Sequence, residues 1–310
     1  MPELPDVVVY CESLDRFYTG KRIRRIDLKS PFLVRTIAPD LFEAEGRRVL
    51  GFRRLGKRIV WELEDELFLV VHLMIAGRFH RKKPGARPKG KTDLAALHFT
   101  EGCEDAPPDG DIVDTLFLTE ASPKKRASVH VVLGEPGLDA HQPGGLEVLD
   151  ATRDQFAAAL RKENHTVKRS LTTPRLFSGI GNAYSDEILL AARLSPLKTT
   201  KRLTDEEVER LYHAVRQTLT EWTDRFRQQT GDAFPEKVTA FRPEMAVHGK
   251  FGKPCPVCAT PVERIRYASN ETNYCRTCQT GGKLLSDRTL SRYLSREEQL
   301  ASRNQQPDDA

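Results

Sequence analysis

The stretch Gly134-Glu-Pro-Gly-Leu-Asp-Ala-His-Gln-Pro-Gly-Gly145 separates two parts of the chain that differ in hydrophobic periodicity. Six of its twelve residues are glycine or proline, the residues that most often interrupt helices and strands. The pattern before it is typical of strands, and the pattern after it is typical of helices. We therefore interpret residues 135–150 as an interdomain linker.

The part before the linker is predicted to be rich in β-strands. Short alternating or β-branched segments occur between clusters of Gly, Pro, Asp and Lys, at residues 22–28, 47–52, 59–63, 67–73, 94–99, 112–118 and 128–133. Seven strands at this spacing favour a β-sandwich or a flattened barrel. Residues 4–18 carry apolar side chains at helical spacing and are followed by Gly20, which predicts one amphipathic helix in front of the strands.

The part after the linker is predicted to be helical. Helical patterns cover residues 152–162, residues 167–177 with an interruption at Pro174, residues 182–193, and residues 204 to about 230. Thr204 and Glu207 form the sequence signature of a capping box at the start of the longest helix. Together with the cysteine-rich segment described next, these patterns predict an α+β protein.

Four of the six cysteines lie in one array near the carboxyl end. Cys255-Pro-Val-Cys258 is followed by sixteen residues and then by Cys275-Arg-Thr-Cys278, a spacing typical of a zinc ion held by four thiolates. A chance cluster of buried cysteines would have to produce both spacings at once. Four thiolates leave no open coordination position, so we expect one structural zinc ion, with residues 262–267 as a strand of a β-hairpin.

Composition excludes several classes of protein. The 310 residues are 39% hydrophobic and 30% charged, which is typical of a polar globular protein and not of a disordered or collagen-like one. The longest apolar runs have about five residues, whereas a membrane-spanning helix needs about 20. The amino terminus has no signal-peptide pattern, so we expect a cytosolic protein without a membrane partner.

The charge distribution is compatible with a polyanionic partner. The net charge is +5, and seven Lys and Arg residues lie between Arg78 and Lys91 with no acidic residue among them. Residues 101–120 contain acidic residues and no Lys or Arg. Each run taken alone is also compatible with a solvated loop.

The amino terminus carries two residues that could perform chemistry. Initiator methionine is readily removed before a small residue, which would leave Pro2 with a free secondary amine. An α-amino group has a reference pKa of about 7.7 to 8.0, so a larger fraction of it is unprotonated at neutral pH than of a lysine. Attack by a secondary amine on an aldehyde-level carbon gives an iminium that serves as an electron sink, and Glu3 is suited to proton transfer at the same carbon. Without further motifs, an ordinary start before a helix explains both residues.

Several motifs in order resemble the formamidopyrimidine-DNA glycosylase and endonuclease VIII family. They are Met1-Pro-Glu-Leu-Pro-Asp6-Val7, Gly56-Lys57-Arg58-Ile59, His72-Leu-Met-Ile-Ala-Gly77, Gly179-Ile-Gly-Asn182-Ala-Tyr-Ser-Asp-Glu187-Ile and the four-cysteine finger. The resemblance covers most of the chain. It implies an N-terminal β-sandwich with a leading helix, a helix-two-turn-helix domain and a C-terminal zinc-finger β-hairpin.

The resemblance also implies a bifunctional enzyme of base excision repair. Pro2 would attack C1′ of the damaged nucleotide, and the Schiff base would undergo β- and δ-elimination. Glu3 would act as acid and base, and Lys57 would lie near the lesion and phosphates, although a solvent-exposed lysine at a strand end is its alternative. Lys168 and Asn182 match the phosphate contacts of the helix-two-turn-helix. The implied partner is double-stranded DNA with damaged bases or abasic sites, bound by a monomer, in a bacterial cytoplasm and its nucleoid.

The chain departs from the family pattern at several positions. Asp6 stands where a glutamate is usual, and Ser122-Pro-Lys-Lys-Arg-Ala127 stands where members that excise oxidised purines carry Asp-Pro-Arg-Arg-Phe-Gly. The aromatic residue of that wedge is absent. Ile75 occupies the position of the family's inserting apolar residue, although a core position in a hairpin is its alternative. Asn270 stands where the finger usually has an arginine that grips a phosphate.

These residues are compatible with three functions. The first is excision of oxidised purines such as 8-oxoguanine and formamidopyrimidines, and the second, within the same class, is excision of oxidised pyrimidines. The third is binding of damaged DNA without cutting it, but binding alone gives no reason for a free proline amine beside a carboxylate. We expect the domain boundaries at residues 1–134, 135–150, 151–235, 236–282 and 283–310.

Overall fold

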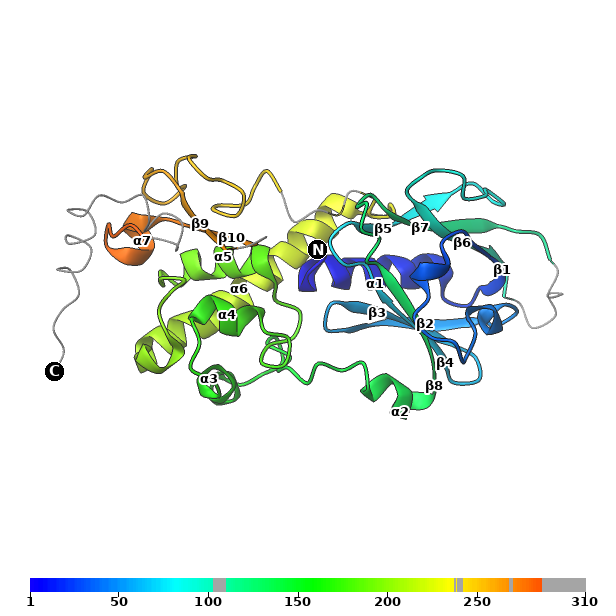
Figure 1. Ribbon diagram of the computed structural model, residues 1–310, viewed down its shortest axis with the longest axis horizontal. Coiled ribbons are helices and arrows are strands. Elements are labelled where there is room, and N and C mark those ends of the chain that lie inside the picture. Colours follow the sequence, from blue (N-terminus) through cyan, green and yellow to red (C-terminus); the bar gives the residue numbers. More distant parts are fainter. Residues whose placement is uncertain (103–109, 237, 239–241, 268–269, 286–310) are drawn as a thin grey trace. The chain divides into compact units, whose positions relative to one another are not determined.

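The computed structural model describes residues 1–102, 110–236, 238, 242–267 and 270–285 (Figure 1). The chain divides into two compact units. The first consists of Met1–Gly145 with Leu219–Ala240, and the second of Leu146–Thr218 with Phe241–Ala310. No helix among the described residues is both long and apolar enough to cross a membrane.

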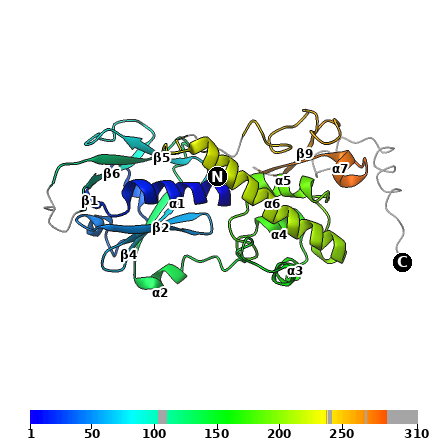
Figure 2. The same ribbon diagram turned by 180° about the vertical axis from the view of Figure 1, so that it is seen from behind.

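The first unit is a sandwich of two antiparallel four-stranded sheets with one long helix, α1 (Leu4–Tyr18). One sheet has the order β1 (Arg22–Leu28), β6 (Asp93–Thr100), β7 (Asp114–Glu120) and β5 (Gly77–Lys82). The other has the order β2 (Val49–Leu55), β3 (Arg58–Leu63), β4 (Leu67–His72) and β8 (Ser128–Leu133). Helix α1 lies between the two sheets in both views (Figures 1 and 2).

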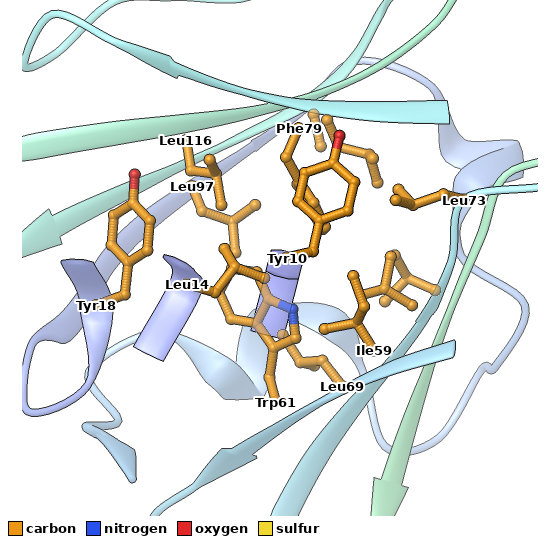
Figure 3. Packing of buried hydrophobic residues seen from close by; sticks show 14 of the residues in the cluster. Tyr10, Leu14, Tyr18, Ile59, Trp61, Leu69, Leu73, Phe79, Leu97 and Leu116 are labelled. Carbon is orange, nitrogen blue, oxygen red and sulfur yellow. The ribbon is translucent and has the colours of Figure 1, made fainter. Parts of the chain in front are cut away.

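The core of this unit is built from the inner faces of the sheets and from α1 (Figure 3). Figure 3 shows Tyr10 and Leu14 of α1 between Trp61 on one sheet and Phe79 on the other. The rings of Tyr10 and Phe79 meet edge to face with centroids 5.7 Å apart. Burial of each such side chain contributes about 1.5 to 3 kcal/mol, so the apolar face of α1 fixes the start of the chain against the sandwich.

The structure confirms the predicted sandwich and leading helix, and adds two elements that periodicity missed. Strand β5 contains Phe79 as its one large apolar residue, and four of its six residues are Arg, His or Lys, so it does not show an apolar alternation. Helix α2 (Gly134–Asp139) begins one residue before the interpreted linker, residues 135–150, and continues into it. Its Leu138 is buried against β4 and β8 side chains, which explains why a glycine-rich segment is helical here.

The second unit contains short helices and a hairpin. The helices are α3 (Arg153–Arg161), α4 (Val167–Thr172), α5 (Asn182–Ala191), the first part of α6 (Asp205–Thr230) and α7 (Arg276–Thr280). Strands β9 (Glu263–Tyr267) and β10 (Asn270–Tyr274) form an antiparallel pair. Helix α4 ends earlier than predicted because Thr173 precedes Pro174 and has an extended backbone.

The long helix α6 contributes to both units. Its predicted capping box is confirmed, since the Thr204 N–H donates to Glu207 Oε2 at 3.0 Å and the Glu207 N–H donates to Thr204 Oγ1 at 3.3 Å. Phe226 and Phe234 complete the core of the first unit. The predicted boundaries of separately folding domains stay predictions. The predicted extension, residues 283–310, lies outside the described residues from residue 286 onward.

Candidate active site and DNA-binding residues

The start of the chain is buried and held in one backbone conformation. Glu3 is the N-cap of α1 with an extended backbone, and Pro5 lies in the first turn, where a missing N–H breaks no helical hydrogen bond. Pro2 is buried, and Glu3 is only 2% exposed. A carboxylate at this position is therefore kept out of bulk water beside the first residues of the chain.

Asp6 holds Glu3 in place. Its carboxylate accepts a hydrogen bond from the Glu3 backbone N–H at 3.0 Å, and Asp6 itself is 1% exposed. This is the N3 side of a capping box, which satisfies a donor that the helix leaves unpaired. The residue that departs from the family pattern by one methylene thus fits as a cap for the backbone of Glu3.

Charged groups of both signs surround the first residue. Burial lowers the pKa of the Met1 amine. The negative charges of Glu3 and Asp6 oppose this shift, and the positive charges of Arg78 and Lys57 add to it. Burial also lowers the pKa of the Lys57 ammonium, and the carboxylate of Glu3 opposes this shift. The charges of Glu3 and Lys57 therefore act on each other and on the Met1 amine, next to Pro2, and the catalytic roles of Pro2, Glu3 and Lys57 stay predictions.

Lys57 belongs to the tight turn between β2 and β3. Gly56, just before it, has a φ of +61°, a backbone conformation that glycine adopts without strain. The Arg54 guanidinium donates to the Gly56 carbonyl at 2.8 Å and closes the turn. The lysine is therefore presented by a rigid hairpin of the sandwich and not by a long loop.

Ile75 lies at the tip of the turn between β4 and β5. Its side chain is 63% exposed, so the alternative of a buried core residue is excluded by the structure. The turn is closed by the Gly77 N–H, which donates to the Leu73 carbonyl at 2.8 Å. A Cβ at Gly77 would lie 2.3 Å from that carbonyl oxygen, so only glycine permits this turn and the exposed position of Ile75.

The segment that replaces the family's aromatic wedge is a short turn fixed by Glu120. The buried Glu120 carboxylate accepts hydrogen bonds from the N–H groups of Arg126 at 3.0 Å and Ala127 at 2.9 Å. The Lys125 ammonium donates to the Glu120 carbonyl. Lys124 and Arg126 are exposed. The turn thus presents cations where purine-excising members have an aromatic ring.

A buried ionic network lies between the helices and the hairpin of the second unit. The Lys168 ammonium donates to the Asn182 carbonyl at 3.2 Å, to Ser185 Oγ at 3.1 Å and to the Asp186 carboxylate. These three acceptors match the three donors of an ammonium group. Lys168 is therefore engaged within the protein, and its predicted contact with a phosphate stays a prediction.

Asp186 and Glu187 connect α5 to the segments of the finger. The second oxygen of Asp186 accepts from His248 Nδ1 at 2.8 Å and from the Asn273 N–H at 3.2 Å. Glu187 accepts hydrogen bonds from the backbone N–H groups of residues 246–248. Sequence reasoning missed both roles, although two adjacent acids on a helix that is otherwise largely apolar are a recognisable signal, because buried carboxylates need partners.

The other two predicted DNA-contacting residues lie close to the hairpin. Asn182 is the first residue of α5, and its side-chain amide donates to the Glu271 carbonyl at 2.8 Å. Gly179, three residues earlier, has a φ of +81° and makes the turn into the helix. Asn270 begins β10 and is exposed. The structure thus brings the start of α5 next to β10, one residue from Asn270.

The four cysteines meet at one point. The sulfur atoms of Cys255, Cys258, Cys275 and Cys278 all lie within 4.8 Å of one another. A zinc ion about 2.3 Å from four tetrahedral thiolates requires sulfur atoms about 3.8 Å apart, so this arrangement fits one structural zinc ion. Among the described residues, no other group of three or more His, Cys, Asp and Glu has such a geometry.

Comparison with known proteins decides the family. The formamidopyrimidine-DNA glycosylase of Thermus thermophilus is 32% identical over 288 residues, which cover 91% of this chain and 100% of the relative. This chain belongs to the formamidopyrimidine-DNA glycosylase family. Models of the family's N-terminal domain, of its helix-two-turn-helix domain and of its zinc finger match residues 1–109, 145–230 and 252–281.

Other family members are similar over different shares of the chain. A formamidopyrimidine-DNA glycosylase-like protein of Mycobacterium tuberculosis is 37% identical over 150 residues, which cover 48% of this chain and 93% of that protein. A structure of MutM in complex with DNA containing carbocyclic 8-oxo-G superposes with a TM-score of 0.77 at 24% identity, covering 90% of this chain and 100% of that one. These matches confirm the predicted family, fold class and four-cysteine zinc finger.

The Lactococcus lactis member of the family has the same fold. Its structure with DNA containing an abasic site superposes with a TM-score of 0.75 at 24% identity, covering 90% of this chain and 99% of that chain. At this identity the superposition shows the fold.

Proposed function

We propose that this protein is a DNA glycosylase and abasic-site lyase of base excision repair. Its substrate would be double-stranded DNA that carries an oxidised base, of the 8-oxoguanine and formamidopyrimidine type, or an abasic site. The observation that carries the proposal is the buried start of the chain, where the charges of Glu3 and Lys57 act on each other and on the terminal amine. A protein that only binds damaged DNA has no use for this arrangement.

In the proposed reaction, Pro2 is the nucleophile. Removal of Met1 exposes its secondary amine, whose nitrogen attacks C1′ of the damaged nucleotide while the bond from C1′ to the base breaks. The base leaves with a proton, and the sugar ring opens to an iminium. Loss of a C2′ proton then breaks the C3′–O bond, and a further elimination breaks the C5′–O bond. Burial favours the unprotonated amine, as it does for the Met1 amine in this structure.

Glu3 and Lys57 support this chemistry in different ways. Glu3 is proposed to protonate the ring oxygen of the sugar as C1′ is attacked, and then to return the proton in later steps. The backbone of Glu3 is held by Asp6, so its carboxylate starts from a defined position. Lys57 is proposed to contact the phosphate beside the lesion, and its proximity to Glu3 allows it to stabilise the carboxylate between proton transfers.

Four residues are proposed to contact DNA or to support such a contact. Ile75 is proposed to insert into the gap left by the extruded base, which its exposed position at a rigid turn permits. Asn182 and Asn270 are proposed to contact backbone phosphates without adding charge. Lys168 is proposed to support this contact by holding the Asn182 carbonyl, since its ammonium is paired with Asp186.

We also propose the division into a catalytic domain (1–134), a linker (135–150), a helix-two-turn-helix domain (151–235), a zinc-finger subdomain (236–282) and an extension (283–310). Bacterial relatives support a place of action on DNA in the cytoplasm. The zinc ion would be structural, because all of its ligands are protein thiolates.

Trapping of the covalent intermediate tests the proposal. Borohydride should reduce the iminium with abasic-site DNA to a stable adduct whose peptide maps to the mature amino terminus. A chain with an N-terminal extension that blocks Pro2 should not be trapped. An adduct on an internal lysine, or none with a mature Pro2, would show that the proposed nucleophile is wrong.

A further inference from the structure

The outer face of the sheet β2-β3-β4-β8 carries a row of basic side chains at one end. Val70 pairs with His130, and His72 pairs with Ser128, so His72 and His130 point to the same face of the sheet. Val60 pairs with Val70, and the same register places Arg58 opposite His72. The sheet therefore aligns Arg58, His72 and His130 on one face.

Helix α2 packs on this face through Leu138, and the segment after the helix adds another histidine. Val60, Val70 and Leu138 form a small apolar cluster that is separate from the core between the sheets. Two residues after α2, the ring of His141 lies 4.7 Å from the ring of His130. Arg58 Nη1 donates to the His141 carbonyl at 3.0 Å. The guanidinium thereby ties the segment after α2 to the start of β3.

The charged groups around these histidines are mostly cations. Arg58 acts on all three histidines, Lys57 acts on His72, and Arg35 acts on His130. Two acids near this face are engaged elsewhere, since Glu62 and Glu135 both pair with Arg53, at 2.7 and 2.6 Å. Asp139 of α2 is exposed. The Arg58 guanidinium is therefore the charged member of this cluster, and burial lowers its pKa with no carboxylate opposing the shift.

His130 also has an unused polar atom. In the described structure, His130 Nδ1 is buried and has no partner at good hydrogen-bond geometry, and the Val70 backbone close to this ring opposes the lowering of its pKa. Burial of the Arg58 guanidinium costs free energy because it removes water from the charge, and the same burial and charge keep the neighbouring imidazoles neutral. A bound anion would supply the negative charge that this cluster lacks and would favour protonation of the imidazoles.

We propose that Arg58, His130 and His141 form an anion-binding site on the outer face of this sheet that accepts a backbone phosphodiester of DNA. This inference rests on the proposed function, because it takes DNA as the source of the anion. His72 connects the new site to Lys57 and to the start of the chain, which acts on it electrostatically. The site would add a contact to the DNA backbone at a position beyond the lesion.

Binding at this site is coupled to protons. Burial and the neighbouring cations lower the pKa of His72 to about 4, and the pKa values of His130 and His141 are lowered for the same reasons. A phosphodiester beside them raises these pKa values, so the complex holds more protons than the free protein. Affinity for DNA therefore increases as the pH falls through the interval between the bound and the free pKa values.

The test measures histidine titration in the full-length protein with and without DNA. NMR signals of the histidine rings, assigned with His130→Gln and His141→Gln, give each pKa in the free protein, with an uncleavable abasic-site analogue in duplex DNA, and with inorganic phosphate. We expect the pKa of His130 and His141 to rise when DNA binds. A rise with inorganic phosphate alone would identify a site for free phosphate and overturn the assignment to DNA.

Affinity provides a second readout. The double variant His130→Gln/His141→Gln should bind this duplex roughly threefold to tenfold more weakly at pH 5.5 and less than about twofold more weakly at pH 8. His213→Gln is the matched control, since His213 is exposed on α6 beside Glu209. Equal loss at both pH values, or binding without any change in histidine pKa, would overturn the site. Absence of DNA binding under all conditions would instead contradict the proposed function.

Discussion

The carboxylate of Asp6 accepts a hydrogen bond from the backbone N–H of Glu3 at 3.0 Å, and both residues are buried. This bond fixes the backbone from which the proposed acid and the proposed nucleophile extend. Asp6 is thus a positioning residue, and a shorter side chain than the family's usual glutamate suffices for it.

Replacement of Asp6 tests whether this residue positions Glu3 for catalysis or only stabilises the fold. Asp6→Ala should cost about 1 kcal/mol of stability through the lost cap and lower base excision roughly tenfold or more, because Glu3 loses its fixed backbone. Asp6→Asn keeps an acceptor and should retain most activity. The control is Glu43→Ala, which removes a similar but exposed cap from Asp40. Thermal unfolding and single-turnover excision would be measured, and equal activity losses in Asp6→Ala and Glu43→Ala would contradict this role.

Glu3→Gln should affect the two reactions unequally. Loss of the acid should lower excision of an intact damaged base by about 100-fold or more, since positioned proton transfer contributes about 10² to 10⁴. Cleavage of a preformed abasic site should decline less, because its aldehyde reacts without departure of a base. Glu12→Gln, at an exposed carboxylate of the same helix, is the control. A parallel decline in both reactions would show that Glu3 acts only structurally.

Salt dependence distinguishes two roles of Lys168. If its ammonium serves only to hold Asn182, Lys168→Met should weaken DNA binding without changing the slope of log affinity against log salt. Asp186→Asn frees the ammonium from its carboxylate, and the slope should then steepen by up to about 0.9. A slope that becomes shallower by about 0.9 in Lys168→Met would indicate a direct phosphate contact in the unaltered protein.

The altered wedge predicts a particular pattern of substrates. Extrusion of a base costs a few kcal/mol, and this chain offers Ile75 and cations where other members add an aromatic ring. We expect weak discrimination of the base opposite the lesion and relatively better activity on abasic, gapped or single-stranded DNA. Ile75→Ala should lower excision from duplex DNA more than cleavage of abasic DNA. Strong preference for 8-oxoguanine opposite cytosine, unchanged in Ile75→Ala, would show that another element fills the gap.

Zinc should be bound with a stoichiometry of one ion per chain. Cys255→Ser should abolish zinc binding and weaken DNA binding, while the β-sandwich retains its unfolding transition, because the hairpin has few apolar contacts of its own. Cys11→Ser, in the core of the sandwich, should lower stability and leave the zinc content unchanged. Metal analysis after purification without chelators and thermal unfolding would check both variants.

Much of this architecture follows from local patterns. The spacing of the cysteines predicts their convergence, and the Thr204–Glu207 capping box predicts the start of α6. Strand β5 was not predictable in this way, because an edge strand rich in Arg, His and Lys shows no apolar alternation.

The ionic contacts are less accessible from sequence than the elements. Asp186 and His248 are 62 positions apart, and the cluster of Arg58, His130 and His141 depends on strand register and on α2. Periodicity gives neither pairing nor register between distant segments. The motif containing Asn182 identifies the start of α5 as a predicted DNA-binding region. The structure adds the hydrogen bond to the Glu271 carbonyl that holds the Asn182 side chain.

The division of α6 between the two units affects how the protein is made. A nascent chain that has left the ribosome only as far as residue 145 lacks Phe226, a member of the core, and Phe234, whose ring packs against Tyr10 and Phe17. The sandwich therefore cannot close its core until more than 230 residues have been synthesised. A premature stop codon in the middle of the message would yield an aggregation-prone fragment with an open core, and not a smaller enzyme.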